Sequence, residues 1–439
     1  MFLSPPNFVL TSLERLSRAG FEAYLVGGCV RDALLGREPG DYDIATDAMP
    51  EQVCGVFSGH QTVDIGMRHG TLTVIVNGCP LEVTTYRRDG IYSDGRHPDQ
   101  VSFTRSLEED LIRRDFTVNA MAWHPDSGLI DPANGRLDCE KRLIRAVGEP
   151  AKRFSEDALR ILRALRFACQ LGFEIEQNTL HAMMKEAAGL SRVSAERVAN
   201  ELNRALLGDF AAQALRAYPR VLFLALPELE PLLPASAQSS GIWEHTLSTL
   251  KGVPPDPALR WAALFLHSGN PNAISRDPDG AARFTGLQAA SARLAGSALE
   301  RLRQSKLLSE QVVTLIRHHN QNISPKNLRL WLSFLGPETA KKLLLLKRSD
   351  HCAREPDSAP IINQLDALYG EAVRLENEGL CLNVRDLAVN GDDLLAMGFR
   401  EDKRLGLALG KLLRRVLLGE LDNQRGALLK AAKDLLIPE

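Results

Sequence analysis

The sequence has little of several features that mark specialised classes of protein. Aromatic residues make up only 6% of its 439 residues, and 53 Lys and Arg against 55 Asp and Glu leave a formal net charge of -2. That balance excludes a uniformly basic surface. No run approaches the roughly 18 uncharged apolar residues of a membrane span, so we expect a soluble protein without a membrane partner.

Cysteines are few and scattered. There are seven, an odd number, and no two form a Cys-x-x-Cys pair, which favours neither a disulfide framework nor a zinc cluster. Residues 1–16 place no basic residue ahead of their apolar stretch and contain two prolines, which is unlike a signal peptide. Together these features predict a cytoplasmic protein.

The pattern of apolar residues changes along the chain. Short β-rich runs at 23–28, 71–76 and 81–87 are separated by Gly, Asp, Asn and Pro, which predicts an α+β unit. From about Phe154 onward apolar residues recur every three or four positions, as in 158–172, which predicts helices. We therefore expect an α+β head followed by a long helical remainder, within a length that suits roughly two to four domains.

Two carboxylates stand two residues apart in this head. Asp41 and Asp43 begin a predicted strand, and alternate strand residues face the same side. Two like charges this close repel each other unless a cation lies between them, and hard oxygen ligands suit Mg²⁺. The alternative is a solvated Asp-x-Asp loop, which is common.

The segment ahead of the carboxylates makes the pattern more specific. A predicted strand ends in Gly27 and Gly28, where backbone N–H groups can approach a phosphate without a Cβ in the way. A helix carrying Arg31 and Asp32 follows. With the carboxylate pair, this order resembles the nucleotidyltransferase superfamily that includes DNA polymerase β.

Four further segments narrow the resemblance. Their order and spacing are similar to those of class II tRNA nucleotidyltransferases and bacterial poly(A) polymerases: residues 111–122, 128–148, 153–167 and 193–202. Residues 69–116 look closest to the CCA-adding enzymes of that family. The resemblance implies an α+β, polymerase-β-like head over 1–145, then an all-helical neck that reads the nucleobase (146–208), a body with a degenerate HD-like domain (209–355) and a tRNA-binding tail (356–439).

The implied reaction is nucleotidyl transfer. A tRNA 3′-hydroxyl attacks the α-phosphate of CTP or ATP and releases pyrophosphate, with Mg²⁺ held by Asp41 and Asp43. Glu82, on the predicted strand 81–87, is the candidate for a third catalytic carboxylate. The alternative is that it is an ordinary surface glutamate.

The resemblance also assigns nucleotide contacts near residue 115. Arg114, Asp115 and Asn119 would meet the triphosphate and ribose, because Arg offers phosphate a bidentate fork and Asp can accept from a hydroxyl. The alternative is an ion-pair cluster within 108–114. We assign Arg113 to that cluster and keep the other three residues as site residues.

The first long predicted helix opens with the candidate base-reading pair. An acceptor from Asp157 beside a donor from Arg160 matches the pairing edges of cytosine and adenine and rejects guanine and uracil. The alternative is an exposed i,i+3 ion pair. Arg163 is assigned to the same nucleotide site, and the last motif supports the base-reading helix through Ser194, Glu196 and Arg197.

The product depends on a loop at 87–98, which looks intact and favours addition of all of CCA. Addition of A alone, or poly(A) synthesis, stays an alternative. Two less favoured alternatives are an HD-type phosphohydrolase and a non-catalytic RNA-binding protein. Segments 141–166, 326–348 and 403–415 are each rich in Lys and Arg, which suits tRNA as partner despite the overall charge. No protein partner is predicted.

The HD-like region, 241–351, keeps His245, His267 and Asp350, but it has Ser268 and Leu287 where an aspartate and a histidine are typical. These losses predict that no transition-metal hydrolase site can form. The adjacent His318 and His319 are expected to be ordinary surface or core residues, because neighbouring helical side chains point about 100° apart.

Overall fold

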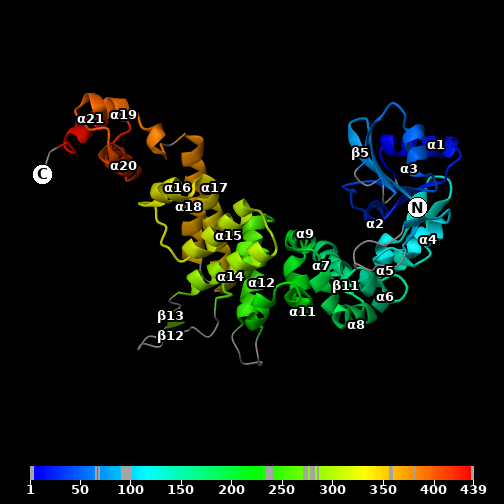
Figure 1. The fold of residues 1–439 in the computed structure, drawn as a ribbon. Coiled ribbons are helices and arrows are strands. Elements are labelled where there is room, and N and C mark those ends of the chain that lie inside the picture. Colours follow the sequence, from blue (N-terminus) through cyan, green and yellow to red (C-terminus); the bar gives the residue numbers. More distant parts are fainter. Residues whose placement is uncertain are drawn as a thin grey trace. The chain divides into compact units, whose positions relative to one another are not determined.

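The computed structural model describes residues 4–64, 67, 70–89, 101–233, 241–269, 275–276, 282–283, 286–354, 359–379 and 381–436. The chain divides into two compact units, Met1–Pro227 and Glu228–Glu439, each with a hydrophobic core of its own (Figure 1). The finer division into head, neck, body and tail stays a prediction.

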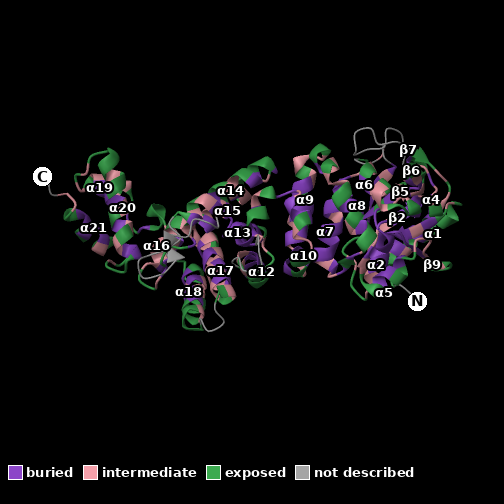
Figure 2. Cartoon of the chain, turned by 90° about the horizontal axis from the view of Figure 1, so that it is seen from below, coloured by how far each residue is buried: buried purple, intermediate pink, exposed green. Residues whose placement is uncertain are grey.

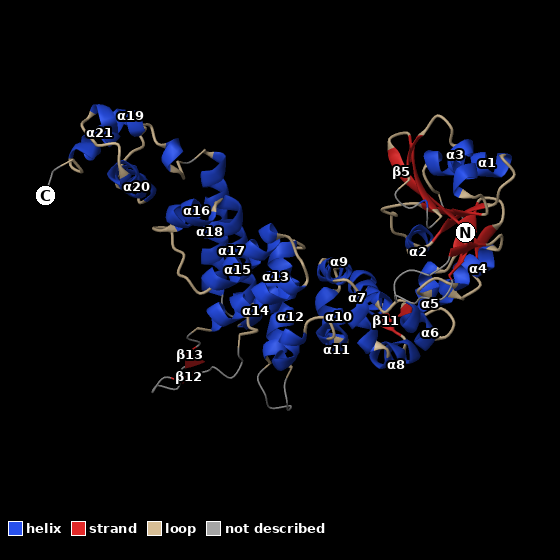
Figure 3. Cartoon of the chain, viewed as in Figure 1, coloured by secondary structure: helices blue, strands red, loops and turns tan. Residues whose placement is uncertain are grey.

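The first unit begins with a mixed sheet, visible in red in Figure 3. Among the described residues its strand order is β3-β4-β5-β2-β1-β8-β9, and β2 and β5 run parallel while the other neighbours run antiparallel. The strands are β1 (Ala23–Val26), β2 (Asp43–Thr46), β3 (Gln61–Val63), β4 (Thr71–Val76), β5 (Cys79–Thr85), β8 (Ala122–His124) and β9 (Gly128–Ile130). The runs expected at 23–28, 71–76 and 81–87 thus supply β1, β4 and most of β5.

Short helices and a hairpin surround this sheet. α1 and α3 pack against β1, β4 and β5, and the alternating burial along β4 reflects its one apolar face. These elements are α1 (Asn7–Arg18), α2 (Gly28–Leu34), α3 (Pro50–Val56), β6 (Arg87–Asp89), β7 (Val101–Phe103), α4 (Leu107–Ile112), a 3₁₀ turn (Thr117–Asn119) and α5 (Gly135–Lys141).

The rest of the first unit is helical apart from a two-residue pair, β10 (Leu143–Ile144) and β11 (Glu174–Ile175). The helix expected over 158–172 is observed as α7 (Leu159–Leu171), and Gly172 ends it in the left-handed conformation. Most of α7 is buried (Figure 2). Its neighbours are α6 (Pro150–Glu156), α8 (Gln177–Lys185), α9 (Ala195–Leu206), α10 (Ala211–Ala217) and α11 (Pro219–Phe223).

The described part of the second unit is helical apart from a short pair, β12 (Ser275–Arg276) and β13 (Ala282–Arg283), which agrees with the α+β head and helical remainder expected from the sequence. Its α-helices are α12 (Ile242–Gly252), α13 (Pro257–Phe265), α14 (Leu287–Arg301), α15 (Lys306–His318), α16 (Leu328–Leu335), α17 (Pro337–Arg354), α18 (Ala359–Asn377), α19 (Gly391–Ala396), α20 (Lys403–Leu417) and α21 (Arg425–Lys433). Within the described ranges, no helix is at once long and apolar enough to cross a bilayer.

Candidate active site

Every site residue predicted from the sequence lines one cleft of the first unit. The cleft has a volume of about 860 Å³ and lies between the β1–β2 end of the sheet and the helices α7 and α9. Residues far apart in the chain, such as Gly27 and Arg197, face the same space. Of the predicted loop at 87–98, the structure places only the start, β6. Residues 90–98 lie outside the described ranges.

Three carboxylates meet at one edge of the cleft. β2 begins at Asp43 and pairs in parallel with β5 so that Asp43 lies opposite Glu82, while Asp41 stands two residues earlier. Burial, followed by repulsion from Asp41 and Glu82, raises the pKa of Asp43 to about 6. A group of acidic oxygens that repel one another in this way is a donor set that fits a hard divalent cation.

The turn between β1 and α2 brings the backbone to the cleft. Gly27 adopts φ +78°, which L-residues with a Cβ disfavour, and its N–H donates to the Met121 carbonyl at 3.2 Å. A Cβ at Gly27 would lie 3.1 Å from Nη1 of Arg114. The glycine therefore leaves room for that guanidinium beside the carboxylates.

Ion pairs hold the two arginines of the 108–114 segment. Arg113 and Arg114 both donate to Asp110, at 2.7 and 3.1 Å. Burial would raise the pKa of Asp110, but these two guanidinium groups hold it below its usual value. The predicted cluster thus includes Arg114 as well as Arg113, whereas Glu109 pairs with Arg88 on β6.

A chain of hydrogen bonds links α2 to α7 across the cleft. Arg31 Nη1 donates to Asn119 Oδ1 at 2.6 Å, and Asn119 Nδ2 donates to Asp115 Oδ1 at 3.3 Å. The other oxygen of Asp115 accepts a hydrogen bond from Nε of Arg163 at 2.7 Å and forms an ion pair with its Nη2 at 2.6 Å. Burial opposes ionisation of Asp115, yet Arg163 lowers its pKa to about 2. Both oxygens of Asp115 therefore already have partners within the protein. The ribose contact expected for Asp115 from the sequence stays a prediction.

The predicted base-reading pair flanks a break between two helices. Asp157 lies between α6 and α7 in an extended conformation, where one oxygen accepts from the Leu159 N–H at 3.0 Å and the other from Arg197 at 2.9 Å. Arg160 donates to Glu156 at 2.7 Å and to the Arg153 carbonyl at 3.0 Å. Each member of the pair is thus fixed by its own partner, and the Arg197 contact agrees with the supporting role expected for that motif.

Sequence reasoning missed an aromatic platform beneath the arginines. The guanidinium carbons of Arg166, Arg31 and Arg163 lie 4.3, 5.3 and 5.7 Å from the ring centroid of Phe167, within cation–π range. Phe167 is 6% exposed, so within the apolar pattern of 158–172 it cannot be distinguished from an ordinary core residue. The recurrence of arginine at 160, 163 and 166 was the signal that one face of α7 is cationic.

Comparison with known proteins independently supports the family resemblance found in the sequence. The family model described as "Poly A polymerase head domain" matches residues 23–145, and the one described as "Probable RNA and SrmB- binding site of polymerase A" matches residues 172–231. The CCA-adding enzyme of Limosilactobacillus fermentum is 35% identical over 426 residues, which cover 97% of this chain and 96% of that protein.

Two further relatives agree with this match. The CCA-adding enzyme of Geobacillus thermodenitrificans is 48% identical over 242 residues, and this alignment covers 55% of the chain and only 58% of that enzyme. The crystal structure of the Bacillus stearothermophilus CCA-adding enzyme in complex with CTP superimposes with a TM-score of 0.73 at 29% identity, covering 98% of both chains.

Proposed function

The chain belongs to the family of CCA-adding enzymes, and from that premise we propose that it adds C, C and A to the 3′ end of tRNA, using CTP and ATP and releasing pyrophosphate. The observation that carries this proposal is the single cleft in which the carboxylates, the Gly27–Gly28 turn and the Asp157–Arg160 pair meet. A metal site, a phosphate-binding turn and a base-reading pair within one cleft are what untemplated nucleotide addition requires.

Mg²⁺ is the proposed cofactor, held by Asp41 and Asp43 with Glu82 as the third carboxylate. When bound, it would lower the pKa of the attacking hydroxyl and neutralise charge on the departing pyrophosphate. The protein's own part is to keep the oxygens together, and the parallel pairing of β2 and β5 does so by placing Asp43 opposite Glu82. The raised pKa of Asp43 supports a cation at this position.

Arginines are the proposed ligands of the triphosphate. Arg31, Arg114 and Arg163 line the cleft and offer guanidinium forks to phosphate oxygens. We assign Asp115 and Asn119 mainly to positioning, because their hydrogen bonds hold Arg163 and Arg31 in place. Gly28 would contribute its backbone N–H group, whereas the Gly27 N–H already donates to the Met121 carbonyl, so Gly27 would serve by leaving room for Arg114. Asp32 holds Arg31 from the other side at 2.8 Å.

Asp157 and Arg160 are the proposed readers of the incoming base. Cytosine and adenine both offer an exocyclic N–H to the carboxylate and an acceptor to the guanidinium, while guanine and uracil present the opposite polarity. Arg197 fixes one oxygen of Asp157, which limits the positions the carboxylate can take. Selection would then come from the protein, without a template strand.

The experiment that tests the function uses two tRNAs, one ending before CCA and one ending in CC, each with CTP or ATP alone in Mg²⁺. We expect C on the first tRNA and A on the second. A protein that adds only A would leave the first tRNA unextended with CTP and still extend the second with ATP. A poly(A) polymerase would add many A residues to both tRNAs, and either outcome would contradict the proposal.

Two further assignments accompany this function. We propose a cytoplasmic location, which suits a chain whose seven cysteines are all free thiols. We also propose that residues 1–145 form the catalytic head, 146–208 the base-reading neck, 209–355 the body and 356–439 a tRNA-binding tail. The basic helix α20 (Lys403–Leu417) in that tail supports contact with tRNA.

Gly27→Ala is expected to lower kcat/KM for CTP by about tenfold, because the new Cβ displaces the Arg114 guanidinium that it would meet. Gly36→Ala is the matched control, since Gly36 also has a positive φ, +69°, but no atom lies within 4 Å of the place that a Cβ would take there. Both variants place a Cβ at a positive φ, so a thermal melt of each records the loss in stability from backbone strain separately from the kinetics. Equal kinetics in the two variants would contradict the role of the Gly27 contact.

Phe167→Leu is expected to raise KM for both CTP and ATP by about tenfold while leaving the choice of base unchanged, because three arginines lose the ring that orients them. Phe173→Leu is the control: Phe173 is 5% exposed and belongs to the same unit but does not line the cleft. Steady-state kinetics and a thermal melt of both variants separate positioning from stability. If KM rises to a similar degree in both variants, Phe167 acts only as a core residue and does not orient the arginines.

A further inference from the structure

Three aromatic rings gather on the surface of the second unit. His318 ends α15, and Trp331 and Phe334 lie three residues apart on α16. The ring centroids are 5.6 Å apart for His318 and Trp331, 5.4 Å for His318 and Phe334, and 5.9 Å for Trp331 and Phe334, and no two rings are stacked face to face. Phe334 is 67% exposed and the other two residues are partly exposed. We call these three residues the aromatic patch.

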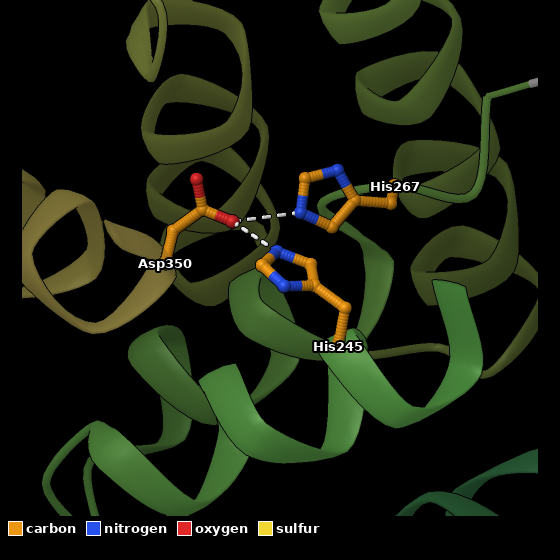
Figure 4. Close-up of side chains that lie close together, drawn as sticks. All are labelled: His245, His267 and Asp350. Carbon is orange, nitrogen blue, oxygen red and sulfur yellow. Dashed lines mark hydrogen bonds and ion pairs between the residues drawn. The ribbon is translucent and has the colours of Figure 1, made fainter. Parts of the chain in front are cut away.

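The aromatic patch is separate from the buried histidines of the same unit. His319, next to His318 in the chain, is 3% exposed and places its Nε2 3.6 Å from Oδ2 of Asp350. Asp350 also contacts His245 and His267 (Figure 4). The adjacent His318 and His319 thus face different surroundings, as neighbouring helical side chains should. The loss of hydrolase activity expected for the buried cluster stays a prediction.

The helix that presents the patch is fixed by its own packing. Leu328 and Leu332 of α16 are each 1% exposed, and the helix packs on α17 and α18 (Figure 1). The Ser333 hydroxyl donates to the Leu382 carbonyl at 2.6 Å. Large apolar side chains that stay exposed together on a packed element mark an interaction surface.

The chain around the patch carries positive charge and no negative charge. From residue 311 to residue 337 there is no Asp or Glu, whereas Arg317, Lys326 and Arg329 lie in this stretch. Arg317 and Lys326 are exposed, and neither forms an ion pair or a side-chain hydrogen bond with another described residue. Burial and the charge of Arg317 lower the pKa of His318, so its ring is neutral near pH 7 and adds aromatic surface.

The neighbouring elements do not reverse this charge. Glu371 of α18 lies close enough to Arg329 to interact with it electrostatically, but it is already paired with Arg374 at 2.7 Å. The loop between α15 and α16 adds the exposed amides of Gln321 and Asn322. The surroundings of the rings are therefore neutral to positive and rich in hydrogen-bonding groups.

We propose that the aromatic patch, with Arg317 and Lys326, binds a single-stranded segment of tRNA, so that one unpaired base stacks on Trp331 and Phe334 and the cations meet the flanking phosphates. This inference rests on the proposed function, which makes tRNA the substrate. Every base has a π face that an aromatic ring can stack on, and surfaces that bind single-stranded RNA combine such rings with cations along the backbone.

The charge also distinguishes RNA from a second copy of the chain as the occupant. A twofold interface between copies places the same surface of each copy against the other. It would bring Arg317 and Lys326 near their own counterparts, where like charges repel. The phosphates of RNA supply the opposite charge instead.

The test measures binding of tRNA ending before CCA, without nucleoside triphosphates, so that no nucleotide is added. Trp331 is an internal probe, because the other three tryptophans are at most 4% exposed. Phe334→Leu removes the ring but keeps an apolar side chain, whereas Phe334→Tyr keeps the ring. Leu307→Ala is the matched control, since Leu307 is also 67% exposed but lies at the other end of α15 from His318.

We expect tRNA to quench the tryptophan emission of the wild type, and Phe334→Leu to raise the Kd for tRNA about tenfold, as the loss of one stacked base should. Phe334→Tyr and Leu307→Ala should bind as the wild type does. An unchanged Kd in Phe334→Leu, or emission that tRNA leaves unchanged, overturns the proposal. A wild-type dimer that Phe334→Leu converts to a monomer also overturns it, because the patch would then join two copies of the chain.

These outcomes are distinguishable from failure of the proposed function. Quenching by tRNA and a weakened Phe334→Leu variant, in a protein that adds no C or A, would support the surface and reject the reaction. Addition of CCA by a protein in which Phe334→Leu binds tRNA normally would reject the surface alone.

Discussion

Asp43→Asn is expected to reduce nucleotide incorporation by about a thousandfold or more while tRNA binding stays almost unchanged, because the variant removes a charged metal ligand but no phosphate-binding group. The asparagine keeps the shape of the side chain and removes a charge that Asp41 and Glu82 repel. Its melting temperature without Mg²⁺ should therefore equal or exceed that of the wild type. Single-turnover incorporation of CTP and equilibrium binding of tRNA measure the two effects separately.

Asp126→Asn is the control for this prediction, because Asp126 belongs to the same sheet region but its side chain is 93% exposed. It should behave as the wild type in both assays. Wild-type turnover in Asp43→Asn would refute the assignment of the carboxylates to the metal site. Loss of tRNA binding together with turnover would instead indicate a folding defect, which the melt would reveal.

Arg160→Ala is expected to relax the choice of base more than it weakens tRNA affinity. Loss of a paired donor costs roughly 1–3 kcal/mol of discrimination, so incorporation of U and G relative to C and A should rise by about 10- to 100-fold. The measurement is kcat/KM for each of the four nucleoside triphosphates on tRNA ending before CCA. Unchanged selectivity would contradict base reading by this residue.

Two variants separate base reading from support of the helix break. Arg197→Met releases one oxygen of Asp157 but leaves the guanidinium of Arg160 in place, so it should relax selectivity to a smaller degree. Arg192→Ala removes an exposed arginine of the same unit and should change nothing. If Arg160→Ala lowers the melting temperature without altering selectivity, its bonds to Glu156 and Arg153 are its whole role.

Local patterns predicted several elements correctly, and the site residues they named all line one cleft, although their roles stay predictions. The strands β1 and β4 and the helix α7 follow directly from apolar periodicity, and Asp41 and Asp43 from their spacing. Glu82 could be named only as a candidate, since its place beside Asp43 depends on the parallel pairing of β2 with β5. Strand pairing of this kind is non-local and leaves no signal in the sequence near either residue.

Other features depended on tertiary contacts that spacing cannot reveal. The sequence predicted that Asp157 lies at the start of one long helix, but in the structure it lies in a break between α6 and α7. Arg197, 40 positions away in the chain, holds its carboxylate there. Phe167 reads as core because helical periodicity cannot distinguish an aromatic platform from ordinary packing. His319 lies beside Asp350 only because α15 ends against α17.

The most direct test of the central claim is the 3′-end sequence of tRNA lacking CCA after incubation with the purified protein, Mg²⁺ and all four nucleoside triphosphates. Selection by the protein alone predicts that the extended products end in CCA and stop there. Products that contain U or G, a run of A, or no added C would contradict the account.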